Sequence, residues 1–299
     1  MTTDQVAELP TGISLAYRTR GEPSAPPVLL TAGLGQDLTA WTDPLIDSLV
    51  ASGLHVIHYD NRDIGRSSYL DHLTPPGPIR LLLSKPRRDA YRLEDMADDA
   101  VGLLDHLGID RAHLVGQSMG GMIAQTIAAH HPTRTATLTS IYSTTGHPSV
   151  GQPAVSTKLK LAGRTLRPSK TREQYVRRHL ALTAHLAGTA YPFDPTDERT
   201  AAERHWDRLG GNGATGWARQ VQAIFASADR TDAVRRITAP TLIINGDQDR
   251  IVAPTGGQAT ATAIPHADHL VIPGMGHHLP PGLTNQISKL LIDHIHTAA

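Results

Sequence analysis

The chain of 299 residues contains no cysteine, which excludes disulfide bonds, a thiol nucleophile and a metal site built on cysteine. It has no net charge, since 28 basic residues balance 28 acidic ones. That balance argues against nucleic acid or an anionic membrane as the main partner. No apolar stretch approaches the roughly 20 residues that a transmembrane helix needs. Aromatic residues are few, with two Phe and seven Tyr, so composition gives no support for an aromatic substrate.

The N-terminal residues 1–6 lack the basic and then apolar pattern of a signal peptide. We therefore expect a soluble protein of the cytoplasm. The chain contains 17 histidines, but none shows the spacing His-x-x-x-His or His-Glu-x-x-His. We expect neither a metal site nor a bound cofactor.

Strand-like and helix-like patterns alternate through most of the chain, which predicts an α/β fold with a mainly parallel sheet. The expected strands are residues 13–19, 28–30, 54–59, 112–115, 137–142, 240–245 and 269–272. The expected helices are residues 41–50, 93–107, 120–129, 257–263 and 283–296. Residues 69–90 are rich in proline and arginine, and we expect a long loop there.

The alternation stops between residues 144 and 231, where polar and basic helical segments replace the strands. The simplest architecture is a core made of residues 1–143 and 232–299, with a helical cap of residues 144–231 inserted between its last strands. A separate domain is less favoured, because segments on both sides of the interval must share one sheet. Trp206 and Trp217 of the cap are expected either to line a pocket or to anchor small helices on the core.

The segment Gly116-Gln117-Ser118-Met119-Gly120 lies between a short apolar strand and a helix of small residues. Strand, Gly-x-Ser-x-Gly and helix form the pattern of a nucleophile elbow, in which the serine is exposed on a tight, strained turn. The glycines are required because a Cβ at either position would collide where the strand turns into the helix. The pattern predicts acyl-transfer chemistry at Ser118, with the backbone N–H of Met119 as one donor to the oxyanion.

A serine hydroxyl needs a neighbouring base, and the base needs an acid that orients it. In this kind of site the order along the chain is serine, acid and histidine. Asp247 and Asp249 follow the expected strand 240–245, and His277 and His278 follow the strand 269–272. The carboxyl ends of parallel strands lie where α/β sheets bind their ligands. The order therefore fits a catalytic triad and leaves two candidates for each partner.

Three segments point to a known family. Residues 56–67 resemble the Asp-x-Arg-x-x-Gly-x-Ser turn of the α/β-hydrolase superfamily. Residues 110–120 and 272–280 resemble the aclacinomycin methylesterases of anthracycline biosynthesis within that superfamily. The resemblance implies the α/β-hydrolase fold. Within the first segment, Asp60, Arg62 and Asp63 are expected to hold a turn by local hydrogen bonds and ion pairs, without a catalytic role.

The resemblance also implies roles for individual residues. It makes Ser118 the nucleophile, His277 the base and Asp249 the acid. Asp247 is the competing candidate for the acid, and His278 is expected to be a neighbour of the base at the edge of the site. Enzymes of the superfamily usually carry His-Gly after the first central strand, whereas this chain has Ala32-Gly33-Leu34. Because the second oxyanion donor is a backbone N–H, the missing histidine need not remove it, and we assign this donor to Leu34.

By resemblance, the expected activity is carboxylic-ester hydrolysis through an acyl-enzyme, acting on a small molecule without a cofactor. The favoured substrate is a methyl ester on a polycyclic polyketide. Serine at the elbow excludes the epoxide hydrolases and haloalkane dehalogenases of this fold, which carry aspartate there. Acyl transfer, cyclisation or a lyase reaction on the same triad stays open. A ligand-binding receptor is less favoured, because binding alone needs neither the base nor the acid.

Overall fold

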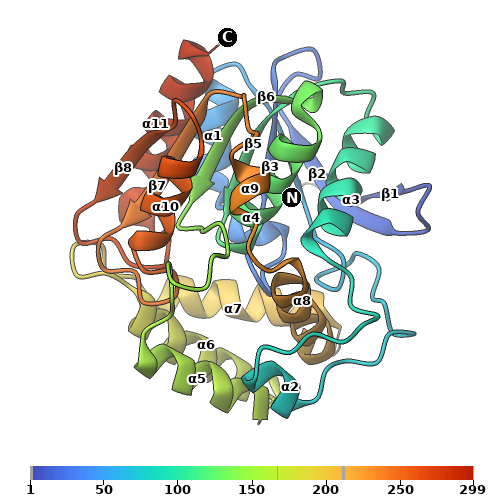
Figure 1. Cartoon of the computed structure of the whole chain (residues 1–299), viewed down its shortest axis with the longest axis vertical. Coiled ribbons are helices and arrows are strands. Elements are labelled where there is room, and N and C mark those ends of the chain that lie inside the picture. Colours follow the sequence, from blue (N-terminus) through green and yellow to red (C-terminus); the bar gives the residue numbers. More distant parts are fainter. Residues whose placement is uncertain (1–2, 167, 211–212, 299) are drawn as a thin grey trace.

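A mixed β-sheet forms the centre of the molecule (Figure 1). The computed structural model describes residues 3–166, 168–210 and 213–298. The sheet has eight strands in the order β1-β2-β4-β3-β5-β6-β7-β8, and only the pairs β1–β2 and β2–β4 are antiparallel. The strands are β1 (Gln5–Glu8), β2 (Ser14–Arg20), β3 (Pro27–Thr31), β4 (His55–Tyr59), β5 (Ala112–Gln117), β6 (Thr135–Ile141), β7 (Thr241–Gly246) and β8 (Asp268–Ile272). The expected α/β fold with a mainly parallel sheet is confirmed.

The central strands are apolar on both sides because helices cover both faces of the sheet. In β3, Val28, Leu29 and Leu30 are all fully buried. Val28 and Leu30 belong to one hydrophobic core and Leu29 to the other, as the alternation of side chains along a strand requires.

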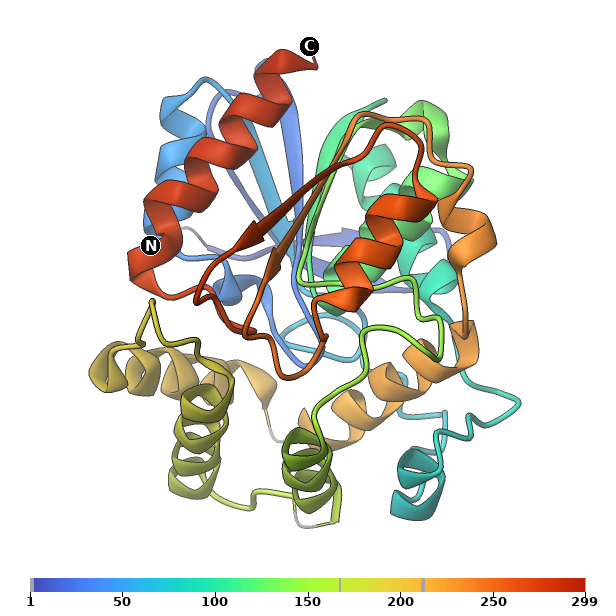
Figure 2. The same ribbon diagram turned by 60° about the vertical axis from the view of Figure 1, so that its left-hand side comes forward.

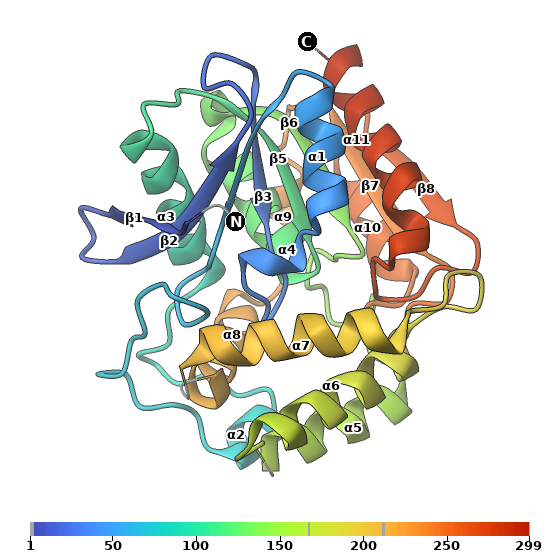
Figure 3. The same ribbon diagram turned by 180° about the vertical axis from the view of Figure 1, so that it is seen from behind.

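Six helices cover the two faces of the sheet (Figures 1 and 3). α1 (Asp43–Ala51) and α11 (Thr284–Thr297) contribute to the core around Val28 and Leu30. The opposite face is covered by α3 (Leu93–His106), α4 (Met119–His130), α9 (Thr231–Val234) and α10 (Thr255–Ala263). Short 3-10 helices lie in connections, namely η1 (Leu38–Ala40), η2 (Pro132–Arg134) and η3 (Pro281–Leu283). Within the described ranges, no helix is long and apolar enough to cross a membrane.

Four further helices lie between β6 and β7, in the interval where the alternation of the sequence stops. They are α5 (Val155–Leu166), α6 (Arg172–Leu186), α7 (Pro195–Leu209) and α8 (Gly213–Ser227), and we call them the cap helices. Figure 2 shows them grouped below the sheet, beyond the ends of its strands. The described residues of this interval contain no strand, as the sequence predicts.

The segment 69–90 is not entirely a loop, which corrects the expectation from its composition. It contains the short helix α2 (Pro78–Leu82), which lies beside α5. Pro78 stands in the first turn, where the missing N–H would have no partner within the helix in any case. Proline therefore starts this helix, whereas the composition alone suggested that it would prevent one.

Two buried arginines join the cap helices to the core. Arg219 of α8 donates to both carboxylate oxygens of Asp63, at 2.9 and 2.6 Å. Arg208 of α7 donates to Asp60 at 2.5 Å and to Asp4 at 2.6 Å. Both arginine side chains are at most 5% exposed. The turn that contains Asp60 and Asp63 is thus held by distant partners in addition to the local ones that the sequence predicts.

Replacing Arg219 by methionine should lower the free energy of unfolding by about 3–5 kcal/mol, because Asp63 would keep a buried charge without its main partner. Urea unfolding followed by circular dichroism measures this change. The matched control is Arg235→Met, whose ion pair with Asp232 has side chains 62% and 89% exposed. That control should change stability by less than about 0.5 kcal/mol. Equally small effects in both variants would contradict the structural importance of the Arg219 pair.

Candidate active site

Ser118 lies on a strained turn between β5 and α4. Its backbone has φ 55° and ψ −120°, a conformation that residues other than glycine rarely adopt and that costs of the order of 1–3 kcal/mol. A Cβ on Gly116 would lie 2.1 Å from the carbonyl oxygen of Gly120, and a Cβ on Gly120 would lie 2.1 Å from that of Thr31. Both positions therefore exclude any side chain, which is the collision that the sequence pattern predicts.

A continuous chain of hydrogen bonds joins Asp249, His277 and Ser118. His277 Nε2 lies 3.0 Å from Ser118 Oγ, and His277 Nδ1 lies 2.7 Å from Asp249 Oδ2. The other oxygen of Asp249 accepts the backbone N–H groups of Ile251 and Val252, each at 2.8 Å. Ser118 itself is only half-buried. The carboxylate is thus fixed from both sides, while Ser118 remains partly exposed.

The competing residues Asp247 and His278 make other contacts. Asp247 Oδ1 accepts the backbone N–H of Gly274 at 2.6 Å, so it holds the turn that precedes His277. His278 Nε2 lies 2.7 Å from Glu198 of α7 and so faces the cap helices. Of the two candidates for each partner, the structure brings Asp249 and His277 to Ser118.

The backbone N–H groups of Leu34 and Met119 belong to two segments that meet at Ser118. Met119 is the first residue of α4. Gly33 passes so close to the serine that a Cβ on it would lie 3.2 Å from Ser118 Cβ. In the described part of the chain neither the Leu34 nor the Met119 N–H donates a hydrogen bond, whereas the N–H of Gly35 donates to Gln220 at 2.9 Å. Both N–H groups are therefore without a hydrogen-bond acceptor among the described residues.

Sequence reasoning missed Tyr142, which follows β6 and packs against the histidine. Its ring centroid lies 4.4 Å from that of His277, and its hydroxyl donates to Gln117. Burial, together with the nearby charge of Asp249, raises the pKa of Tyr142 well above its ordinary value, so the hydroxyl stays protonated. No motif marks this tyrosine, because its contact with His277 depends on how distant strands are arranged.

The cap helices contact the histidine loop directly. The backbone N–H of His277 donates to the carbonyl of Leu186, at the end of α6, at 2.9 Å. A Cβ on Gly276 would lie 2.0 Å from the same carbonyl oxygen. A Cβ on Gly188 would lie 1.9 Å from the carbonyl oxygen of Gly274. The position of His277 therefore depends on a cap segment that sequence reasoning did not connect with it.

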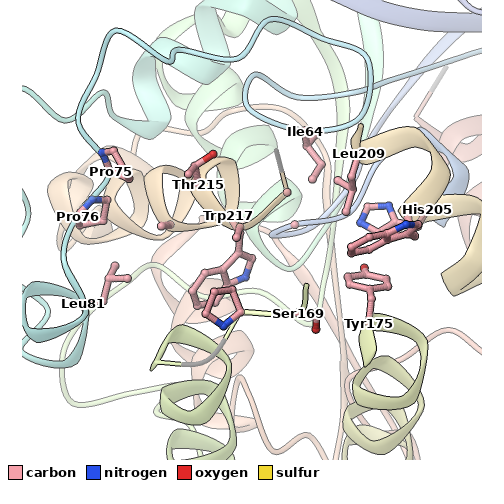
Figure 4. Close-up of a pocket in the computed structure, with 16 residues that line it drawn as sticks. Ile64, Pro75, Pro76, Leu81, Ser169, Tyr175, His205, Leu209, Thr215 and Trp217 are labelled. Carbon is pink, nitrogen blue, oxygen red and sulfur yellow. The ribbon is translucent and has the colours of Figure 1, made fainter. Parts of the chain in front are cut away.

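A cavity of about 240 Å³ lies between the cap helices and the core (Figure 4). Gly35, next to Leu34, forms part of its wall. Trp206 and Trp217 both line the cavity, which is one of the two roles expected for them. Trp217 also packs closely on Gly35: a Cβ on Gly35 would lie 2.6 Å from the Trp217 ring.

Within the described ranges, no group of three or more His, Asp or Glu side chains is arranged to hold a metal ion.

Comparison with known proteins shows which family the chain resembles. Residues 26–280 match the model of the alpha/beta hydrolase fold family. The chain is 29% identical over 296 residues to rhodomycin D methylesterase DnrP of Streptomyces peucetius, covering 93% of each chain. It is 29% identical over 259 residues to 3-oxoadipate enol-lactonase 2 of Acinetobacter baylyi, covering 85% of this chain and 83% of the relative.

A solved structure gives the same result for the fold. The enol-lactonase from Burkholderia xenovorans LB400 superposes with a TM-score of 0.74 at 26% identity, covering 98% of this chain and 100% of that one. These matches confirm the resemblance that the motifs indicate. The chain belongs to the α/β hydrolase fold family.

Proposed function

We propose that the protein is a serine hydrolase that cleaves carboxylic esters through an acyl-enzyme. The observation that carries this proposal is the chain of hydrogen bonds from Asp249 through His277 to Ser118, with lengths of 2.7 and 3.0 Å. A carboxylate at Nδ1 keeps the proton on that nitrogen, so the lone pair of Nε2 faces the serine hydroxyl. His277 can therefore accept the proton of Ser118 Oγ as the oxygen attacks an ester carbonyl.

The remaining steps follow from the same geometry. The N–H groups of Leu34 and Met119 stabilise the negative oxygen of the tetrahedral intermediate. His277 then returns its proton to the departing alcohol, which leaves the acyl group on Ser118. A water molecule that gives a proton to His277 attacks the carbonyl of the acyl-enzyme. The bond between the acyl group and Ser118 Oγ then breaks, the acid leaves, and His277 returns the proton to Ser118 Oγ. Asp249 stabilises the imidazolium form of His277 in both halves of the reaction.

We further propose that the core and the cap have different roles. Residues 1–143 and 232–299 form the core that carries the catalytic groups, and residues 144–231 form a cap that selects the substrate. In support, the four cap helices fall within that interval and contribute Tyr175, Trp206 and Trp217 to the cavity wall. Gly35 connects this cavity with the loop that carries Leu34.

For the substrate we propose a methyl ester on a polycyclic polyketide. One support is the similarity to a rhodomycin D methylesterase along 93% of the chain. The other is the predominantly apolar and aromatic wall of the cavity, which includes Gly35, the residue after Leu34. Flat apolar ring systems gain affinity in such a cavity by burial and by ring contacts.

A fluorophosphonate should attach covalently to Ser118, because this residue is partly exposed and its hydroxyl has a base at 3.0 Å. Mass spectrometry of the intact protein and of its peptides detects the added mass and its position. Ser118→Ala should remain unlabelled and should lose at least about 10³-fold in turnover of p-nitrophenyl acetate. Absence of label on folded protein would contradict the proposed nucleophile.

Asp249→Asn should lower kcat for p-nitrophenyl acetate by about 10³–10⁴-fold, because an amide at Nδ1 favours the wrong tautomer of His277. The matched control is Asp247→Asn, which keeps a carbonyl oxygen that can accept the Gly274 N–H. We expect the control to retain kcat within about fivefold, since a neutral acceptor replaces an ionised one. Steady-state kinetics on both variants measure the contrast. The reverse ranking would reassign the acid to Asp247.

A panel of methyl esters tests the proposed substrate. Liquid chromatography with mass spectrometry should show conversion of polycyclic polyketide methyl esters to their free acids. Their kcat/KM should exceed that of methyl acetate by at least about 100-fold, since burial of a ring system contributes several kcal/mol of binding. A 3-oxoadipate enol-lactone serves as the comparison substrate. Unchanged polycyclic esters with prompt opening of the lactone would refute the substrate and leave the reaction class intact.

A further inference from the structure

Exposed apolar side chains gather on two neighbouring helices at one end of the molecule. Six large hydrophobic side chains are exposed among the described residues, and four of these lie on α5, on α2 or directly after α2. They are Ile79, Leu83, Val155 and Leu159, which are 59–76% exposed, and we call them the apolar patch. α2 and α5 lie side by side at the end of the molecule opposite the C-terminus (Figures 1 and 3).

The spacing along each helix places these side chains in pairs. Ile79 and Leu83 are four residues apart, as are Val155 and Leu159, so each pair lies on one side of its helix. Leu81, between the first two, is buried and lines the cap cavity. Single exposed apolar residues are ordinary, but a group of four on adjoining helices marks a surface that binds something.

The two segments that carry the apolar patch are also strongly basic. Residues 78–88 and 155–161 contain six basic residues and no acidic residue. The basic residues are Arg80, Lys85, Arg87, Arg88, Lys158 and Lys160. Within the described ranges, only Arg87 among them forms an ion pair, with Asp89. The other five are exposed. Because the whole chain has no net charge, composition conceals this local excess, on which the partner of the patch depends.

The size and the charge of the apolar patch favour an anionic lipid surface over a protein. A stable protein interface takes about 20–30 residues from each partner, far more than the patch provides. Pairing with a second copy about a two-fold axis would bring the same basic segments together. A bilayer needs no matching shape, since its interface accepts apolar side chains and its anionic headgroups attract lysine and arginine.

We propose that the apolar patch docks on the surface of an anionic lipid bilayer. The four apolar side chains enter the boundary between headgroups and acyl chains, and the basic residues lie against the headgroups. Since Leu81 of the same short helix lines the cap cavity, docking brings that cavity close to the bilayer. An apolar ligand dissolved in lipid then has a short path to the cavity. The inference goes beyond the proposed function and does not depend on the chemistry at Ser118.

Sedimentation of the intact protein with vesicles tests the docking. One set of vesicles is phosphatidylcholine alone, and the other is an equal mixture of phosphatidylcholine and phosphatidylglycerol. The partition coefficient should be at least about tenfold higher for the mixed vesicles, because several unpaired cations contribute to binding. Added sodium chloride should lower it by screening these charges. Absence of binding to the mixed vesicles, or equal binding to both sets, would overturn the proposal.

Substitution of apolar side chains locates the contact. Ile79→Ser combined with Leu159→Ser removes one side chain from each pair and should lower the partition coefficient at least about tenfold. The matched control combines Val6→Ser with Val271→Ser, which removes the two exposed hydrophobic side chains outside the patch, on the edge strands β1 and β8. The control should bind as the unaltered protein does. Circular dichroism checks that both variants are folded. Unchanged binding by the folded patch variant would refute the docking.

A second pair of variants tests the basic residues. Lys158→Gln combined with Lys160→Gln should weaken binding to the mixed vesicles by about fivefold or more. The matched control combines Arg235→Gln with Lys289→Gln, which changes the net charge equally but lies at α9 and on α11 of the core. It should bind as the unaltered protein does. Equal losses in the two variants would show that net charge alone governs binding, against the proposed orientation.

Two further measurements separate the competing outcomes. If analytical ultracentrifugation found dimers that Ile79→Ser with Leu159→Ser abolishes, and vesicles did not bind, the patch would belong to a second copy and the proposal would be wrong. Ser118→Ala should bind vesicles as the unaltered protein does. Vesicle binding without turnover or label at Ser118 would refute the hydrolase and support the docking.

Discussion

The close contact of β3, β5 and α4 is the constraint on which the site is built. With no side chain at Gly116 or Gly120, α4 can start directly against the end of β3, and Ser118 can adopt its strained turn. The same contact brings Gly33, the residue before Leu34, past the serine. A single steric requirement thus positions both Ser118 and the loop that carries Leu34.

Buried ion pairs hold the cap helices against the core. Asp37, close in sequence to Leu34, and Asp60, directly after β4, both lie against Arg208 of α7. Asp63 faces Arg219 of α8 in the same manner. Separating these partners would leave charges without compensation in a dry interior. The cap helices and the loop that carries Leu34 are therefore expected to unfold together.

Local patterns were sufficient to predict the fold and the elbow, because both depend on residues near one another in the sequence. Alternation identified the parallel sheet, and the interval without strands indicated where the cap helices lie. The choice between Asp247 and Asp249 could not be made from spacing, since two residues separate them and the loop decides which one faces His277. His205 Nδ1 lies 2.8 Å from Asp37 Oδ2, but the two residues are 168 positions apart in the chain, so no motif records this contact.

The hydrogen bond from the His277 backbone to Leu186 has a consequence for the evolution of specificity in this molecule. A cap that only covered the site could be exchanged for another by recombination. Here the end of α6 supports the histidine, and Gly188 and Gly274 meet without room for a side chain. A transplanted cap must therefore bring its own segment equivalent to Leu186 and Gly188, or the histidine loses its support. New specificities are more accessible by substitution within the present cap than by its replacement.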